Sequence, residues 1–295
     1  MSMRGQTTAA AASPAGLEAE VAAAGHRHWP SSWHLFLVPM SALMAFPFLW
    51  MLITSVSTLE ESRRFPPQLP SSIQWHNFID AWTMAPFSRW LLNTVVVAAA
   101  SVVGNLLFCS LAGYALARMR FIGSGVAFML ILATLMVPFQ VVMIPTLLIV
   151  RAFGMVDSLG GLVVPNLVTP FGIFLLLQFF RTLPVEIEEA ARIDGAGRLG
   201  TLVKIVLPQM KAPLATVGIM TLLWRWNDFL WPLILITSED KMTLPLGLAT
   251  FQGAHFTNWP VLMAGTLMSQ LPMLLVFIFA QRWFVQSLAS SGIKG

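Results

Sequence analysis

Two side chains of opposite charge interrupt the apolar run Pro213–Thr237. Arg225 and Asp228 are three residues apart, so on a helix they share a face and can form an ion pair. If this run spans a membrane, each charge at its centre would cost about 2.5 to 3.5 kcal/mol, so both must face protein or water. The pair is either a self-neutralised couple that stabilises helix packing or part of the path of a polar solute. In the second interpretation, aromatic, amide and charged groups stack on a sugar ring and hydrogen-bond its hydroxyls, and the candidates are Trp224, Arg225, Asn227 and Asp228.

The second concentration of functional groups is the long loop Arg181–Met210. Pro184 suits the first turn of a helix, three glutamates favour its positive end, and Gly195 is a natural stop. We expect two short helices joined by a glycine-containing elbow, which would make a knob able to fill a cleft on another protein. A loop that merely links two spans is the alternative. The residues expected on one face are Ile187, Ala190, Ala191 and Asp194 in the first helix and Leu199, Leu202, Val203 and Val206 in the second.

The other reactive residue types form no catalytic or metal-binding pattern. We expect no metal site from the five scattered histidines, which are His26, His28, His34, His76 and His255. The stretch 195–200 satisfies GxGxxG, but a dinucleotide site requires a preceding strand and a βαβ unit, so these glycines are expected to shape the elbow. No GxxxxGK followed by Ser or Thr occurs, and no nucleophile and base are paired, so neither ATP hydrolysis nor another enzyme activity is expected of this chain.

The elements that must position these residues are apolar helices. Apolar residues make up 57% of the 295, and only 10% are charged, a balance that few soluble domains could keep from water. About 20 apolar residues in a helix cross the roughly 30 Å hydrocarbon core of a bilayer. We predict an all-α polytopic membrane protein with six transmembrane helices: Trp33–Ser57, Trp90–Ala115, Gly125–Val150, Leu159–Phe180, Pro213–Thr237 and Val261–Phe284. Prolines are expected to kink or shorten the third and fourth helices, namely Pro138, Pro145, Pro165 and Pro170.

The ends and loops predict the orientation in the membrane. Residues 1–28 are Ala-rich and contain no aromatic residue, so we expect a disordered cytoplasmic tail, followed by a membrane domain over residues 29–295. The first apolar run starts late and is long enough to span, so it is expected to be kept rather than cleaved as a signal peptide. Most of the 17 Lys and Arg residues fall on the side of the N-terminus, which favours both termini in the cytoplasm. Cys109 is the only cysteine, so an intrachain disulfide is excluded.

One loop carries a resemblance to a known family. Glu189-Ala190-Ala191, then Gly195 after three residues, then Ile205-x-Leu207-Pro208 after nine more, resembles the EAA loop of ABC importer permeases. Other segments are similar to the carbohydrate branch of these permeases, related to those for maltose and glycerol phosphate: Leu92-Asn93-Thr94, Ala112-Gly113-Tyr114-Ala115-Leu116-Ala117-Arg118, Ile144-Pro145, Gly154-Met155-Val156-Asp157-Ser158, Trp226-Asn227-Asp228-Phe229-Leu230-Trp231-Pro232 and Gly292-Ile293-Lys294-Gly295. The resemblance covers roughly residues 30 to 295.

This resemblance implies a permease subunit in the cytoplasmic (inner) membrane of a bacterium or archaeon. Its partners would be a second related permease, two ATPase subunits and an extracytoplasmic solute-binding protein, with no nucleic acid involved. ATP and magnesium would bind the ATPase subunits, and this chain would hold no cofactor. The solute would be a di- or oligosaccharide, a polyol or glycerol phosphate, moved by alternating access.

The resemblance also assigns roles to residues of this chain. The loop 181–210 would dock on an ATPase, with the coupling residues Glu188, Glu189, Ala190, Ala191, Asp194, Gly195, Ile205, Leu207 and Pro208. Because the partner permease can hold most solute contacts, the residues around Arg225 can instead form a gate or the seam between permeases. A homodimeric pore is also compatible with the sequence.

Two other classes of protein remain as alternatives. An ion-coupled secondary transporter would need intramembrane carboxylates and an inverted repeat, but Asp228 is the only acid within a predicted span and no repeat is visible. A membrane-embedded enzyme would need clustered acids, histidines or metal ligands at a membrane face. The acids expected outside are instead scattered over Glu60, Glu61, Asp80, Asp157, Glu239 and Asp240.

Overall fold

The computed structural model describes the backbone of residues 32–66, 68–253 and 257–292, and the side chains up to Phe279. The expected tail, residues 1–28, lies outside the described residues together with His26, His28 and His255. Two compact units make up the chain, Met1–Trp50 and Met51–Gly295. The functional residues predicted from the sequence all belong to the second unit.

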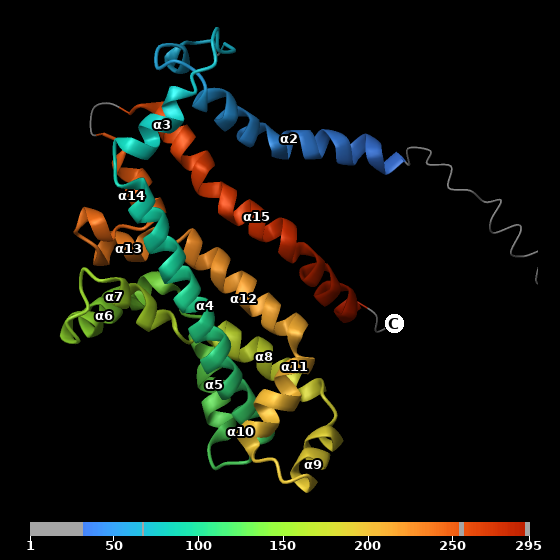
Figure 1. Ribbon diagram of the computed structural model, residues 1–295. Helices are drawn as coiled ribbons and strands as arrows, with labels where there is room; N and C mark the ends of the chain where they lie inside the picture. The colour runs from blue at the N-terminus through green and yellow to red at the C-terminus, as the bar shows by residue number, and fades with distance from the viewer. Residues whose placement is uncertain (1–31, 67, 254–256, 293–295) are drawn as a thin grey trace, which may run out of the picture. The chain divides into compact units, whose positions relative to one another are not determined.

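Helices are the only extended regular elements in the described part of the chain, as the composition predicts (Figure 1). The long and medium α-helices are α2 (Ser32–Ser55), α3 (His76–Thr83), α4 (Phe87–Arg118), α5 (Ser124–Leu135), α6 (Phe139–Ala152), α8 (Pro170–Thr182), α9 (Val185–Ile193), α12 (Lys211–Trp226) and α15 (Trp259–Gly292). The short ones are α7 (Leu159–Val163), α10 (Arg198–Thr201), α11 (Leu207–Gln209), α13 (Leu230–Leu235) and α14 (Leu244–Thr250). Three 3-10 turns, η1 (Glu61–Arg63), η2 (Val164–Asn166) and η4 (Glu239–Lys241), and a π-helix, η3 (Leu202–Val206), complete the described elements.

Four stretches of the described chain are long and apolar enough to cross a membrane: Trp33–Ser55, Phe87–Arg118, Leu159–Thr182 and Trp259–Phe279. Two further pairs of helices satisfy the same criteria but are sharply bent, Ser124–Leu135 with Phe139–Ala152 by 109° and Arg198–Gln209 with Lys211–Trp226 by 85°. The spans number six only if each bent pair crosses once. The bend in the first pair falls at Pro138, whose missing N–H and fixed φ start a new helix.

The prediction of one continuous helix over Pro213–Thr237 is wrong. Helix α12 begins at Lys211 and ends at Trp226, and the separate helix α13 follows after a break. Arg225 therefore lies in the last turn of α12, and Asp228 lies in the break. Because a helix rises about 1.5 Å per residue, Arg225 is about 21 Å from Lys211 along the helix, at the end of α12 farther from α9.

Helix α4 organises the second unit, because it packs against α7, α8, α12 and α14 (Figure 1). Its contact with α8 is close: a Cβ built on Gly113 would lie 3.2 Å from the backbone nitrogen of Leu177. In the middle of α4, the buried Asn105 amide donates to the carbonyl oxygen of Asn166 at 2.6 Å and its oxygen accepts from the Thr169 hydroxyl at 2.6 Å. These bonds satisfy backbone and side-chain groups where the chain between α7 and α8 is irregular.

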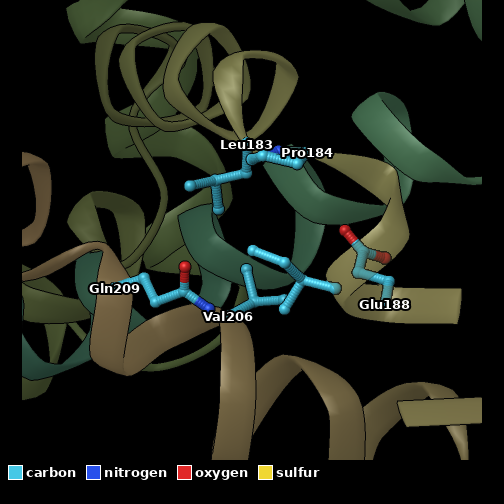
Figure 2. A pocket seen from close by; sticks show the side chains of 6 residues that line it. Leu183, Pro184, Glu188, Val206 and Gln209 are labelled. Atoms are coloured by element: carbon cyan, nitrogen blue, oxygen red, sulfur yellow. The ribbon is translucent and has the colours of Figure 1, made fainter. Parts of the chain in front are cut away.

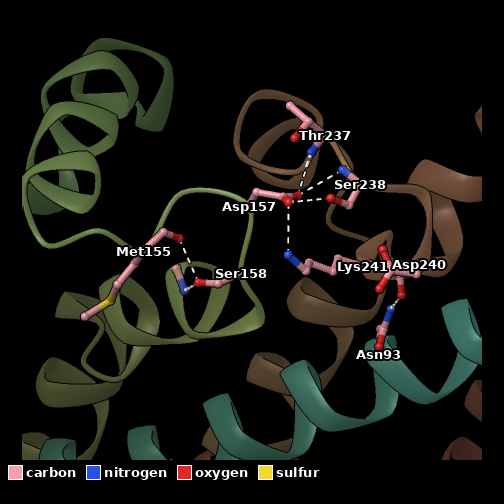
Figure 3. A network of polar contacts seen from close by, with 9 residues as sticks. Asn93, Met155, Asp157, Ser158, Thr237, Ser238, Asp240 and Lys241 are labelled. Carbon is pink, nitrogen blue, oxygen red and sulfur yellow. Dashed lines mark hydrogen bonds and ion pairs between the residues drawn. The ribbon is translucent and has the colours of Figure 1, made fainter.

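The loop between α13 and α14 is fastened from two sides (Figure 3). From α4, the Asn93 amide donates to the carbonyl oxygens of Asp240 at 2.8 Å and Met242 at 2.9 Å. From the α6–α7 loop, the Asp157 carboxylate accepts from the Ser238 backbone N–H at 2.9 Å and from the Lys241 ammonium at 3.0 Å. These donors, the Ser238 hydroxyl first among them, hold the pKa of Asp157 well below its ordinary value. Two segments that carry the family resemblance, around Asn93 and Asp157, thus hold one loop.

Candidate functional site

The loop 181–210 folds into the predicted pair of short helices. Pro184 occupies the N-cap position of α9, and Glu186 and Glu188 lie in the first turn, where their negative charge interacts favourably with the helix dipole. At the other end, Gly195 adopts φ +81°, its N–H donates to Arg192 O at 3.0 Å, and the Ala196 N–H donates to Ala191 O at 2.9 Å. These two bonds form a Schellman motif, which ends the helix with a left-handed residue and favours glycine there. The predicted stop at Gly195 is confirmed.

The four residues predicted to share one face of α9 differ in burial. Glu188 and Ala191 are 2% and 3% exposed, and Ile187 is half-buried, whereas Ala190 and Asp194 are exposed. The side of α9 that packs against the permease therefore includes a charged residue, Glu188, which apolar periodicity does not single out. In the segment after the elbow, Leu202 and Val206 are buried, whereas Leu199 and Val203 are exposed.

The buried carboxylate of Glu188 is satisfied by two side chains from the end of α4. Its Oε2 accepts from the Tyr114 hydroxyl at 2.8 Å, and its Oε1 accepts from the Arg118 Nε at 2.6 Å. Arg118 also donates through Nη2 to the carbonyl oxygen of Leu183, just after α8, at 2.7 Å. Periodicity does not reveal this cluster, because its members are about 70 residues apart in the chain. In the sequence, the segment Ala112–Arg118 carries part of the family resemblance, but its local spacing does not indicate a contact with α9.

The last three predicted coupling residues follow the elbow. Ile205 lies in the π-helix η3 and is half-buried, Leu207 begins α11 and is half-buried, and Pro208 is exposed. Their neighbours Val206 and Gln209 face α9 across a narrow crevice, which Leu183 and Pro184 also line (Figure 2). The crevice has no room for a water molecule, so α9 rests directly on the segment that leads into α12.

The second group of predicted residues lies at the other end of α12. The Arg225 guanidinium binds the Asp228 carboxylate at 2.9 Å, and the two side chains are 19% and 18% exposed. Trp224 is 44% exposed and meets the ring of Phe171 edge-on at 5.4 Å. The Asn227 amide donates to the carbonyl oxygen of Leu223.

These four residues line one open cavity of about 610 Å³, together with Phe139, Leu223, Phe229 and Leu230. An aromatic face, an amide and an ion pair therefore surround one concave space, as the solute-path interpretation requires. The ion pair that the alternative interpretation requires is present as well. The structure thus brings Trp224, Arg225, Asn227 and Asp228 together around one cavity. The length of α12 separates this cavity from the buried carboxylate of Glu188.

Comparison with known proteins identifies the family. Residues 106–290 match the model of the binding-protein-dependent transport system inner membrane component. The match covers more than half of the chain and includes both α9 and α12. The chain therefore belongs to this family, the permeases of binding-protein-dependent ABC importers, and the resemblance seen in the sequence is confirmed.

Curated relatives cover nearly the whole chain. An arabinooligosaccharides transport system permease protein of Halalkalibacterium halodurans is 37% identical over 86% of this chain and 92% of the relative. An sn-glycerol-3-phosphate transport system permease protein of Pectobacterium atrosepticum is 35% identical over 88% of this chain and 95% of the relative. A diacetylchitobiose uptake system permease protein of Streptomyces coelicolor is 31% identical over 94% and 93%. All three are named as permeases, which are transport components rather than enzymes.

A solved structure agrees with the fold. The crystal structure of a bacterial ABC transporter involved in the import of the acidic polysaccharide alginate aligns with a TM-score of 0.76 over 94% of this chain and 100% of that chain. The sequence identity is 24%, so this likeness supports the fold alone.

Proposed function

We propose that this chain forms one half of the pore of an ATP-driven importer and moves a sugar or sugar-like solute into the cytoplasm by alternating access. The three relatives above carry in their names an oligosaccharide, a chitin disaccharide and a glycerol phosphate. Each of these solutes carries free hydroxyl groups on its carbon skeleton. We therefore assign a di- or oligosaccharide, a polyol or glycerol phosphate to this chain.

One observation supports coupling to ATPases above all others: α9 exposes one side and is fastened on the other. Glu189, Ala190 and Asp194 are exposed, while Glu188 is bound to α4. A short helix held in this way can enter a cleft on an ATPase and pass that subunit's movement into the membrane helices. The two ATPase subunits hold ATP and magnesium, and this chain binds no cofactor. ATP drives the cycle because its binding favours one of the two states of the ATPase pair.

The solute path runs past Trp224, Arg225, Asn227 and Asp228. Their cavity is open, and a second, related permease closes it in a heterodimeric pore. An extracytoplasmic binding protein delivers the solute to this cavity. The excess of Lys and Arg on the side of α9 supports an orientation with that loop and both termini in the cytoplasm.

Co-purification from native membranes tests this proposal. The wild type is compared with Glu189→Lys, which reverses a charge on the exposed side of α9, and with Gly195→Pro, which cannot adopt φ +81°. Glu60→Lys is the matched control, because it makes the same charge change at an exposed residue before α3.

We expect an ATPase subunit to accompany the wild type and the Glu60→Lys control. In Glu189→Lys and Gly195→Pro, the ATPase is expected to be lost or uncoupled from uptake. A chain that purifies without an ATPase and moves solute on an ion gradient alone would contradict the proposal and favour the secondary transporter.

A further inference from the structure

Helix α9 carries three glutamates, and only one of them turns inward. Glu186 and Glu189 are exposed, whereas Glu188 is 2% exposed. Burying a carboxylate is costly unless it is paired and hydrogen-bonded. Contact with a partner protein does not explain this residue, because its carboxylate faces the permease itself.

The pairing of Glu188 uses both of its oxygen atoms. The Tyr114 hydroxyl donates to Oε2 at 2.8 Å, and the Arg118 Nε donates to Oε1 at 2.6 Å. Both donors come from the last two turns of α4, one turn apart on the same face. A carboxylate held at both oxygens by one helix has little freedom to rotate or slide, because movement in either direction breaks a charge-assisted bond.

Arg118 extends this link to a third element. Its Nη2 donates to the carbonyl oxygen of Leu183, which follows α8, at 2.7 Å. One guanidinium therefore joins the end of α4, the end of α8 and the first turn of α9. These bonds cross the turn Leu183–Pro184, the two residues that connect α8 to α9.

The side chains around these hydrogen bonds are closely packed. The Tyr114 ring meets the Phe180 ring edge-on at 5.6 Å, and Gly113 lets the α8 backbone approach closely. Tyr114 and Phe180 belong to the same apolar cluster as Leu202 and Val206 of the segment after the elbow. The crevice between α9 and that segment is too narrow for water.

We propose that Tyr114 and Arg118 are positioning residues for energy coupling. Acting through Glu188, they make α9 move as one body with the cytoplasmic end of α4, so that displacement of α9 by an ATPase reaches the helix against which α7, α8, α12 and α14 pack. This inference rests on the proposed function, because it requires that an ATPase displaces α9. It gives a role to the segment Ala112–Arg118, which docking of α9 alone leaves unexplained.

Reconstitution of the complete importer tests the inference, with solute imported per ATP hydrolysed as the readout. Glu188→Gln and Arg118→Gln remove one charge each, and Tyr114→Phe removes a single oxygen atom while keeping the ring. The matched control is Asn93→Ala, which removes two hydrogen bonds to carbonyl oxygens at the other end of the same helix. A general weakening of α4 would affect the control and the test variants alike.

We expect all variants to co-purify with the ATPase. Import per ATP is expected to fall at least tenfold in Glu188→Gln and Arg118→Gln and several-fold in Tyr114→Phe, while ATP hydrolysis continues and Asn93→Ala keeps the wild-type ratio. Wild-type ratios in the three test variants, or an equal fall in Asn93→Ala, would overturn the inference.

The remaining outcomes are also decisive. If the two charge variants do not assemble, Tyr114→Phe carries the test, and a wild-type ratio in that variant overturns the inference. If no ATPase co-purifies with the wild type, both the proposed function and this inference are overturned. Wild-type assembly with unchanged ratios in the variants overturns this inference alone.

Discussion

Neutralising the Arg225–Asp228 ion pair at the end of α12 tests whether the pair only stabilises helix packing or also contacts the solute. Asp228→Asn leaves the Arg225 guanidinium without its partner at 2.9 Å, and Arg225→Gln leaves the carboxylate alone. A charge at the bilayer centre costs about 2.5 to 3.5 kcal/mol, and breaking a buried pair costs about 3 to 5 kcal/mol. Both side chains keep nearly a fifth of their surface exposed, so hydration in the open cavity reduces these costs.

We therefore expect each single substitution to destabilise the folded permease by about 2 kcal/mol, which is a roughly 30-fold change in the folding equilibrium. The double variant Arg225→Gln/Asp228→Asn holds no unpaired charge, so it should regain most of this stability. If the pair also hydrogen-bonds the solute, the double variant assembles normally but imports with an apparent KM raised at least tenfold. We predict that the double variant shows this rise in the apparent KM.

The assay combines two measurements on the same membranes. The thermal midpoint of the detergent-solubilised complex reports stability, and uptake of radiolabelled solute over a concentration series reports the KM. The control pair Arg64→Gln/Glu60→Gln removes an exposed ion pair, for which we expect no measurable change. A stable Arg225→Gln/Asp228→Asn variant with the wild-type KM would refute solute contact and leave the pair as a packing element.

Three further predictions concern the geometry of loops and close contacts. Gly195→Ala should destabilise α9 by about 1 kcal/mol because φ is +81°, whereas Gly197→Ala, with φ −72° and equally free space, imposes no such strain and should leave limited proteolysis within α9 unchanged. Gly247→Ala would place a Cβ 2.2 Å from a buried indole ring, so we expect about 1 to 3 kcal/mol of destabilisation and a lower thermal midpoint. Because the pKa of Asp157 is depressed in the folded state, its contribution to stability is present above the unfolded value of about 3.9 and is lost as the pH falls through the folded value. Asp157→Asn should therefore melt below the wild type at pH 7, and the difference should shrink as the pH falls below about 4.

Local physical chemistry explains which features could be predicted from the sequence. The all-helical membrane fold follows from the length and apolarity of the runs, since only helices or closed barrels satisfy the backbone in lipid. Helix ends at Pro184 and Gly195 were also predictable, because a fixed φ or a positive φ acts within a few residues. The EAA pattern identified the loop that contains α9 for the same reason, since its spacing is contained in one short segment.

The fifth span shows where apolarity is insufficient. The run Pro213–Thr237 is apolar throughout except for Arg225 and Asp228, yet its helix ends at Trp226. After that residue the Asp228 carboxylate binds the Arg225 side chain and accepts from the Trp231 backbone N–H at 3.4 Å. The same pair that was expected on one face of a helix therefore lies across a helix end.

The orientation of α9 was decided by the tertiary structure alone. Periodicity places Ala190, Ala191 and Asp194 on one face, but it does not say which side of the helix is buried. In the structure Ala190 and Asp194 are exposed, and Glu188 is buried. A carboxylate is stable there only because Tyr114 and Arg118 of α4 are folded against it, and no local pattern encodes a contact across some 70 residues. The sequence by itself determined the all-helical membrane class, the ends of α9 and the family. The tertiary structure decided which side of α9 is bound to the permease and which side is left for a partner, because that choice depends on charges brought together from distant segments.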